Sequence, residues 1–152
     1  MKAAILTLLL AAAGPSQIAS GMIDYSWTMS PAQVAARSKG TIPEGKGGLW
    51  IAFKDYDKGV EYQAGNVGQI TIFDKLMETG FYYAGGKLGQ VRTYRKEACP
   101  DFGTKLKARF GAPVKEADYS GDYYATWIDP ASNTEIRLSA SSDCRVFFVK
   151  VD

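Results

Sequence analysis

Apolar residues recur with two different periods along this chain, and the change of period separates predicted helices from predicted strands. Residues 30–40 predict a short helix: Ser30 is a good N-cap, proline follows at the first helical position, Gln33 completes a capping box, and a Lys-Gly pair ends the segment. A second helix is predicted at residues 100–110, where Phe102 and Leu106 begin a four-residue repeat of apolar positions. Both predicted helices are short and have clear ends.

Elsewhere the apolar period is two, which is typical of strands. The Gly85-Gly86 pair suits a tight hairpin turn, since both central residues of such a turn need positive φ. Ile136 and Leu138 are expected to point inward from one strand of the C-terminal block. The predicted strands are residues 49–54, 70–73, 79–84, 87–95, 123–128, 134–140 and 144–151.

The predicted order is helix, strands, helix, strands, and the connections between strands are too short for parallel crossovers. We therefore predict an α+β fold in which antiparallel β-sheet meanders carry two short helices packed on one face. This element order resembles that of secreted bacterial inhibitors and envelope-assembly modules built from repeated helix-and-sheet units. The resemblance implies an inhibitor or an envelope-associated module. It rests on the order of elements alone, and no individual residue is assigned a role from it.

The beginning of the chain has the layout of a secretory signal peptide: Met1-Lys2, an apolar run at residues 3–13, a Gly-Pro break and then small residues. The run is shorter than the roughly 20 residues that span a bilayer, so no membrane insertion is expected after cleavage. Small residues at Ala19 and Gly21 favour cleavage before Met22, with cleavage before Gly21 as the neighbouring choice. The prediction is a signal peptide at residues 1–21 and a single periplasmic or secreted domain at residues 22–152.

Cys99 and Cys144 are the only cysteines of the chain. In an exported chain an even number of cysteines predicts a disulfide. The bond would join the start of the second predicted helix to the last predicted strand, and it would stabilise the fold by ~4 kcal/mol if the gain is the lost entropy of the unfolded chain. A zinc site is not expected, because the chain has no histidine and two thiolates do not complete such a site.

The charge balance argues against two classes of partner. The chain has 18 basic and 16 acidic residues, and only Lys2 of these lies in the predicted signal, so the remaining domain carries 17 basic and 16 acidic residues. This balance predicts neither a nucleic-acid partner nor an anionic membrane. The absence of histidine also removes the usual activation of serine or cysteine nucleophiles and the imidazole base. No cofactor or metal is predicted.

Three short motifs resemble known sites, and their context argues against each. Residues 40–46 have the glycine and lysine spacing of a phosphate-binding loop, but Gly47 replaces the hydroxyl residue that coordinates magnesium, and the segment follows a helix rather than a strand. Residues 55–61 contain three carboxylates, but their spacing does not fit a calcium loop and Lys58 adds a positive charge, so a strand-to-strand turn is predicted. Residues 101–103 match a kinase triplet without its companion motifs.

The remaining enzyme hypothesis is a pair of carboxylates, as in glycosidases. Its candidates are Asp55 or Asp57 together with Asp118 or Asp122. Such a pair would make the chain a hydrolase of cell-envelope polysaccharide, and exposed turn residues are the competing interpretation of these aspartates. We keep this hydrolase as the alternative to a non-enzymatic function.

The favoured hypothesis is a binding surface at residues 118–124, where tyrosine, serine, glycine and aspartate are mixed. Binding loops favour this composition because tyrosine supplies rigid contact area and small polar residues supply adaptable hydrogen bonds; a simple hairpin tip is the competing interpretation. The expected partner is a protein or a cell-envelope component, and inhibition of an extracytoplasmic enzyme is the sharpest form of this hypothesis. A structural subunit of an envelope assembly is a third hypothesis. The predicted binding residues are Tyr119, Asp122, Tyr123 and Tyr124.

Overall fold

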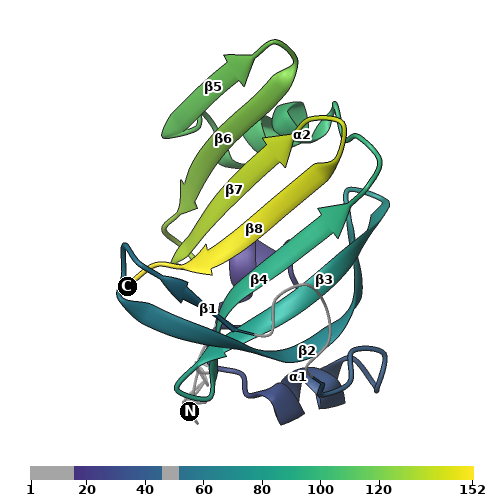
Figure 1. The fold of residues 1–152 in the computed structure, drawn as a ribbon, viewed down its shortest axis with the longest axis vertical. Coiled ribbons are helices and arrows are strands. Elements are labelled where there is room, and N and C mark those ends of the chain that lie inside the picture. The colour runs from purple at the N-terminus through teal and green to yellow at the C-terminus, as the bar shows by residue number, and fades with distance from the viewer. Residues whose placement is uncertain (1–15, 46–51) are drawn as a thin grey trace, which may run out of the picture.

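The computed structural model describes residues 16–45 and 52–152 (Figure 1). Predictions that fall on residues 1–15 and 46–51 lie outside the described residues. These predictions are the apolar run of the signal peptide, the lysine of the glycine-rich motif and the first part of the strand at 49–54. The elements are η1 (Ile18–Gly21), α1 (Pro31–Arg37), β1 (Ala52–Asp55), β2 (Val60–Ile72), β3 (Lys75–Ala84), β4 (Lys87–Arg95), α2 (Phe102–Phe110), β5 (Lys115–Tyr119), β6 (Asp122–Asp129), β7 (Thr134–Ala140) and β8 (Cys144–Lys150).

The sheet consists of two meanders that meet in its centre. Its eight strands follow the order β1-β2-β3-β4-β8-β7-β6-β5, and every neighbouring pair is antiparallel. β4 pairs with β8, so that Val91 lies opposite Phe148. We call β1–β4 the first meander and β5–β8 the second meander. The predicted antiparallel sheet with two helices is confirmed.

Local signals in the sequence account for both ends of α1 and for the end of α2. The backbone N–H of Ser30 donates to Gln33 Oε1 at 2.9 Å, and the Gln33 N–H donates to Ser30 Oγ at 3.3 Å, which is the predicted capping box. α1 ends at Arg37, earlier than predicted. The helix cannot continue because the next residues turn the chain away: φ is positive at the lysine before Gly40 and is 81° at Gly40 itself. α2 ends at its predicted residue and is followed by a glycine at φ 83°.

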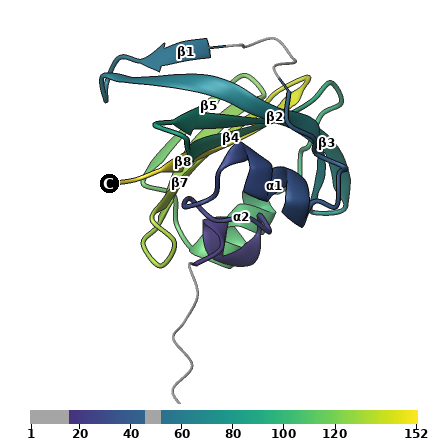
Figure 2. The ribbon, with the colours of Figure 1, turned by 90° about the horizontal axis from the view of Figure 1, so that it is seen from below.

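The main core lies between the sheet and the elements on one of its faces. Figure 2 shows α1, α2 and η1 together on the same side of the sheet. Val34 of α1 and Phe102 and Leu106 of α2 are fully buried and belong to one apolar cluster with the sheet. The sheet contributes residues at alternate strand positions, as a period of two predicts. These residues are Met77, Phe81, Leu88, Val91, Trp127, Ile136, Leu138, Val146 and Phe148.

The predicted disulfide between Cys99 and Cys144 is present, with Cα atoms 5.6 Å apart. Cys99 lies in the segment between β4 and α2, and its carbonyl accepts a hydrogen bond of 3.2 Å from the N–H of Phe102, the first residue of α2. Cys144 is the first residue of β8. The bond therefore ties the segment that leads into α2 to the centre of the sheet.

The hairpin β1–β2 folds across the face of the sheet opposite the helices, which we call the open face. The ring of Phe53 stacks on Tyr62 at 5.2 Å between centroids and meets Tyr82 edge-on at 5.1 Å. At the turn of the hairpin, the Lys58 ammonium donates to the carbonyl oxygen of Lys150 at 2.6 Å, so the hairpin reaches the end of β8. A small second core fills the space between the hairpin and the open face.

Three strands differ from the prediction, and the smallest difference is that β3 begins at Lys75 rather than at residue 79. β2 extends far beyond the predicted residues 70–73, because a register shift between Ala64 and Asn66 interrupts the alternation that would have revealed the whole strand. β5 was not predicted, since its sequence Lys-Glu-Ala-Asp-Tyr is mostly charged and lacks apolar alternation, as is common for an edge strand. Residues 118–124 therefore form the end of β5, a turn at Ser120-Gly121 and the start of β6.

Candidate functional site

The candidate site lies on the open face of the second meander and follows from the strand register. Side chains that alternate with the core positions point to the open face. Residues paired across neighbouring strands share a face, so they form rows that run across the sheet. The two rows at the site are Thr126, Arg137, Phe147 and Arg92, and Tyr124, Ser139, Arg145 and Tyr94, each in the order β6, β7, β8, β4.

These two rows enclose a shallow hollow of about 290 Å³. The ring of Tyr124 lies 6.2 Å from the ring of Tyr119, so a pair of tyrosines stands beside the hollow. The hollow combines guanidinium and hydroxyl groups with two aromatic rings, those of Tyr124 and Phe147. Its lining residues are Tyr124, Ala125, Thr126, Arg137, Leu138, Ser139, Arg145 and Phe147.

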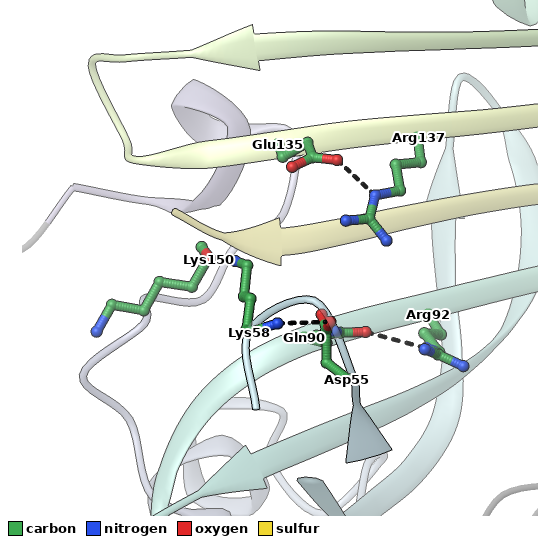
Figure 3. Close-up of polar contacts among 7 residues, drawn as sticks. All are labelled: Asp55, Lys58, Gln90, Arg92, Glu135, Arg137 and Lys150. Atoms are coloured by element: carbon green, nitrogen blue, oxygen red, sulfur yellow. Dashed lines mark hydrogen bonds and ion pairs between the residues drawn. The ribbon is translucent and has the colours of Figure 1, made fainter. Parts of the chain in front are cut away.

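Both arginines of the hollow pair with a carboxylate two residues earlier in the chain. Arg137 Nε lies 2.5 Å from Glu135 Oε1, and Arg145 Nη2 lies 3.2 Å from Asp143 Oδ2. Figure 3 shows the two terminal nitrogens of Arg137 directed away from Glu135. Each guanidinium carries five N–H donors, so one contact of this kind leaves donors for a further acceptor.

A third arginine of the open face, Arg92, is covered by the hairpin β1–β2. Its guanidinium carbon lies 3.7 Å from the centre of the Phe53 ring and 4.6 Å from the centre of the Phe147 ring. Its Nε donates to Gln90 Oε1 at 3.0 Å (Figure 3). Burial lowers the pKa of the guanidinium from its ordinary value, and arginine nevertheless stays charged at neutral pH. Arg92 thus contributes cation–π contacts that hold the hairpin.

Two of the four predicted binding residues lie side by side on the open face. Tyr119 and Tyr124 have exposures of 67% and 43%, which are large for aromatic side chains. Asp122 is exposed and pairs with Tyr119 across the hairpin. Tyr123 points to the opposite face and is half-buried, so the structure separates it from the other three.

Tyr123 belongs to a small polar cluster that fastens the hairpin β5–β6 to α2. Its hydroxyl donates to Glu116 Oε1 at 2.8 Å, and the Lys107 ammonium donates to the same oxygen at 2.7 Å. The hydrogen bond from Lys107, followed by that from Tyr123, holds the pKa of Glu116 below its ordinary value. Burial, followed by the hydrogen bond to Glu116, raises the pKa of the Tyr123 phenol. These contacts give Tyr123 a structural role.

The carboxylates of the hydrolase hypothesis are not brought together. Asp55 and Asp57 lie in or next to β1, and Asp118 and Asp122 lie in β5 and β6. β1 and β5 form opposite edges of the sheet. A glycosidase pair needs carboxyl groups roughly 5–9.5 Å apart. Neighbouring strands are already about 4.8 Å apart, so strands at opposite edges of this eight-stranded sheet are too far apart to supply such a pair. Within the part of the chain that the structure describes, no group of three or more His, Cys, Asp and Glu residues is placed to hold a metal ion.

A larger hollow, of about 680 Å³, lies between the start of α1 and the ends of β2 and β3. Glu44 and Glu61 contribute carboxylates to its lining, and Tyr83 contributes a ring. Its border includes Gly45, which directly precedes residues 46–51, outside the described range.

The lining residues of β7 and β8 were missed by sequence analysis. Arg137 lies between the inward-facing Ile136 and Leu138, and Ser139 follows Leu138. Arg145 precedes the buried Val146. This alternation was a signal that these side chains share one face. The predicted antiparallel meander places β6, β7 and β8 side by side, but nothing in the sequence showed that this part of the open face stays uncovered, so the arginines and Tyr124 were not joined into one site.

Comparison of the chain with protein-family models, with curated proteins and with solved structures finds no match. The resemblance in element order to inhibitor and envelope-assembly modules therefore stays a prediction. In residues 16–45 and 52–152, no helix is long and apolar enough to cross a membrane.

Proposed function

We propose that this protein is a non-enzymatic binding protein that recognises a protein partner through the open face of its second meander. The single observation that carries this proposal is the exposed Tyr119–Tyr124 pair beside the arginine-lined hollow. Tyrosine and arginine are enriched among the residues that dominate the energy of protein interfaces. The opposite face of the same strands is filled by the core and by α2, so it offers no comparable surface.

The scaffold behind this face is suited to binding without rearrangement. β6, β7 and β8 are paired along their lengths, and the disulfide fixes the start of β8. Side chains on such a sheet are held in place before binding, which reduces the conformational entropy lost when a partner docks. The disulfide also supports a location in the periplasm or outside the cell, where such bonds persist. Inhibition of an extracytoplasmic enzyme is the sharpest form of the proposal.

The test compares three forms of the oxidised protein on a column. The parent, the double variant Tyr119→Ala/Tyr124→Ala and the control variant Tyr56→Ala are each immobilised and exposed to envelope and culture extracts. Tyr56 is a suitable control because it is 84% exposed and lies in the turn of the first meander, away from the site. A protein retained by the parent and the control is then purified and titrated against all three forms.

The proposal predicts that the purified partner binds the parent and Tyr56→Ala equally and binds the double variant at least ten-fold more weakly. Amide hydrogen exchange in the complex is expected to be slowed in residues of β5 to β8. Equal binding by all three forms would place the interface elsewhere. An extract from which nothing is retained would contradict the proposal as well.

A further inference from the structure

The hollow of the second meander is rich in hydrogen-bond donors. Besides its two arginines, it contains the hydroxyl groups of Tyr124, Thr126 and Ser139. Among the described residues, none of these three hydroxyls has a hydrogen-bond partner within the chain. Glu135 and Asp143 each engage one nitrogen of their arginine at the side of the hollow. The lining itself therefore presents donors and no carboxylate.

Donors of this kind select an acceptor that carries negative charge. Guanidinium groups bind carboxylates through paired, charge-assisted hydrogen bonds, which are stronger than bonds between neutral groups. The hollow is shallow and opens beside the Tyr119–Tyr124 pair, so a chain that places an acid in it also contacts two aromatic rings. This arrangement fits an acidic side chain within a protein loop better than a free small acid, because the tyrosines add contact area for flanking residues.

We infer that the hollow between Arg137 and Arg145 is an anchor site for an Asp or Glu side chain of the protein partner. This inference rests on the proposed function and specifies the chemistry of the partner. Arg137 and Arg145 bind the carboxylate, and the hydroxyls of Thr126 and Ser139 donate to it. Arg92, which is covered by Phe53, takes no part.

A displayed library of disulfide-constrained random peptides tests this inference without knowledge of the natural partner. Parent protein is expected to enrich peptides with a shared Asp or Glu. Arg137→Gln/Arg145→Gln should bind these peptides about 10- to 100-fold more weakly, the change expected when charge-assisted hydrogen bonds are lost. The control Lys87→Gln/Lys96→Gln removes the same charge at exposed positions outside the hollow and should bind within about three-fold of the parent.

The outcomes separate this inference from the proposed function. Peptides that lack acids, or that bind the arginine variant as well as the parent, would overturn the anchor site. If such peptides still lose binding to Tyr119→Ala/Tyr124→Ala, the open face remains the recognition surface. If the parent enriches no peptide at all, both the anchor site and the recognition surface are contradicted.

A second inference concerns where the exported protein begins, and it comes from the burial of η1. Ile18 and Ala19 have no exposed surface and belong to the main core. The Ile18 N–H donates to the Tyr25 carbonyl at 2.9 Å, and the Ala19 N–H donates to Thr134 Oγ1 at 3.3 Å. Residues upstream of the expected cleavage points are thus part of the folded domain.

The next residue extends the same attachment to β6 and α2. Ser20 Oγ donates to Asp129 Oδ2 at 2.6 Å, and Arg109 Nη2 donates to the Ser20 carbonyl at 3.1 Å. Cleavage before Gly21 or Met22 would remove Ile18, leave a hole in the core and leave Asp129 and Thr134 with fewer partners. Holes and unpaired polar groups in a core are both destabilising.

We infer that the signal peptidase cuts upstream of Ile18, between Ala13 and Gly14, and that η1 stays in the mature protein. Ala11 and Ala13 supply the small residues that signal peptidase requires at the third and first positions before the cut. The signal peptide would then end with the apolar run, and the folded domain would begin close to Ile18. This inference does not depend on the binding function.

N-terminal sequencing and intact mass of the full chain, exported to the periplasm of a bacterial host, test the position of the cut. The expected first residue is Gly14, and Ala13→Leu is expected to accumulate as uncut precursor. A mature chain that starts at Gly21 or Met22 would overturn the inference. Thermal unfolding of the exported Ile18→Asp variant gives a second readout: a lowered midpoint is expected, and an unchanged midpoint would show that η1 is dispensable.

Discussion

The two meanders have the same order of elements, a helix followed by strands. They differ in whether their part of the open face is covered. The first meander covers its part of that face with its own hairpin, and Phe53 lies on Arg92 and Tyr82. The second meander leaves its part bare, and its exposed tyrosines and arginines surround a hollow. The difference shows that similar side chains are packed against the protein's own hairpin in one half and are left exposed in the other.

The meanders also differ in how they are attached to the layer beneath them. In the first meander the buried Asn66 amide donates to the carbonyls of Pro31 and Ile42 at 3.0 and 3.3 Å, and the Tyr83 hydroxyl donates to its oxygen. The second meander is held by the disulfide and by η1. The half with the uncovered face is thus supported by a covalent bond, while the self-covered half relies on hydrogen bonds and aromatic contacts.

The largest effect is expected from removal of the covalent support. Cys99→Ser/Cys144→Ser should lower the free energy of unfolding by about 4 kcal/mol, the loop entropy that the bond removes from the unfolded chain. Urea unfolding of the parent and the variant measures this loss. Ser142→Ala, in the neighbouring turn, is the control and should unfold like the parent. A double variant as stable as the parent would mean that the second meander does not depend on the bond.

An intermediate effect is expected when the cover of the first meander is loosened. Phe53→Ala removes the cation–π contact with Arg92 and two aromatic contacts, and should cost about 1–2 kcal/mol. Amide hydrogen exchange should become faster in β1 and the adjoining part of β2, and stay unchanged in β6 to β8. If Phe53→Ala and Tyr56→Ala exchange equally slowly in β1, the hairpin is held by something other than Phe53.

A small effect on stability is expected on the bare half. Tyr124→Ala should change the free energy of unfolding by no more than about 0.5 kcal/mol, because an exposed side chain contributes little to the core. Thermal unfolding measures this change, and the binding assays measure the accompanying loss of affinity. A strongly lowered melting temperature would show that Tyr124 serves the fold, which would erase the contrast between the halves.

The smallest effect concerns Glu116, which links β5 to α2. Its folded pKa is lowered, so its contribution to stability is present above the unfolded pKa and is lost as the pH falls through the folded pKa. Glu116→Gln should therefore melt slightly below the parent at pH 7, and the two melting curves should converge in acid. Lys107→Met should show the same convergence, and a gap that persists at low pH would rule out this ionic contribution.

Local patterns in the sequence predicted the elements whose information lies within a few residues. The capping box of Ser30 and Gln33, the Gly85-Gly86 turn with φ of 58° and 77°, and the inward positions of Ile136 and Leu138 follow from neighbouring residues alone. β5 escaped prediction because edge strands carry charged rather than alternating residues. Of the predicted site residues, Tyr119 and Tyr124 share a surface, and Tyr123 packs against the helix layer.

The antiparallel meanders, the two helices and the single pairing open to Cys99 and Cys144 followed from the order of residues, because turns, caps and cysteine number are local or countable properties. Three features came from the folded chain alone: β4 pairs with β8, Phe53 covers Arg92, and Arg137, Arg145 and Tyr124 border one hollow. Contacts of the first two kinds join strands that are distant in the chain, and the hollow depends on which part of the open face the hairpin β1–β2 leaves uncovered. Their partners are selected by the packing of the whole sheet, which no local period of residues encodes.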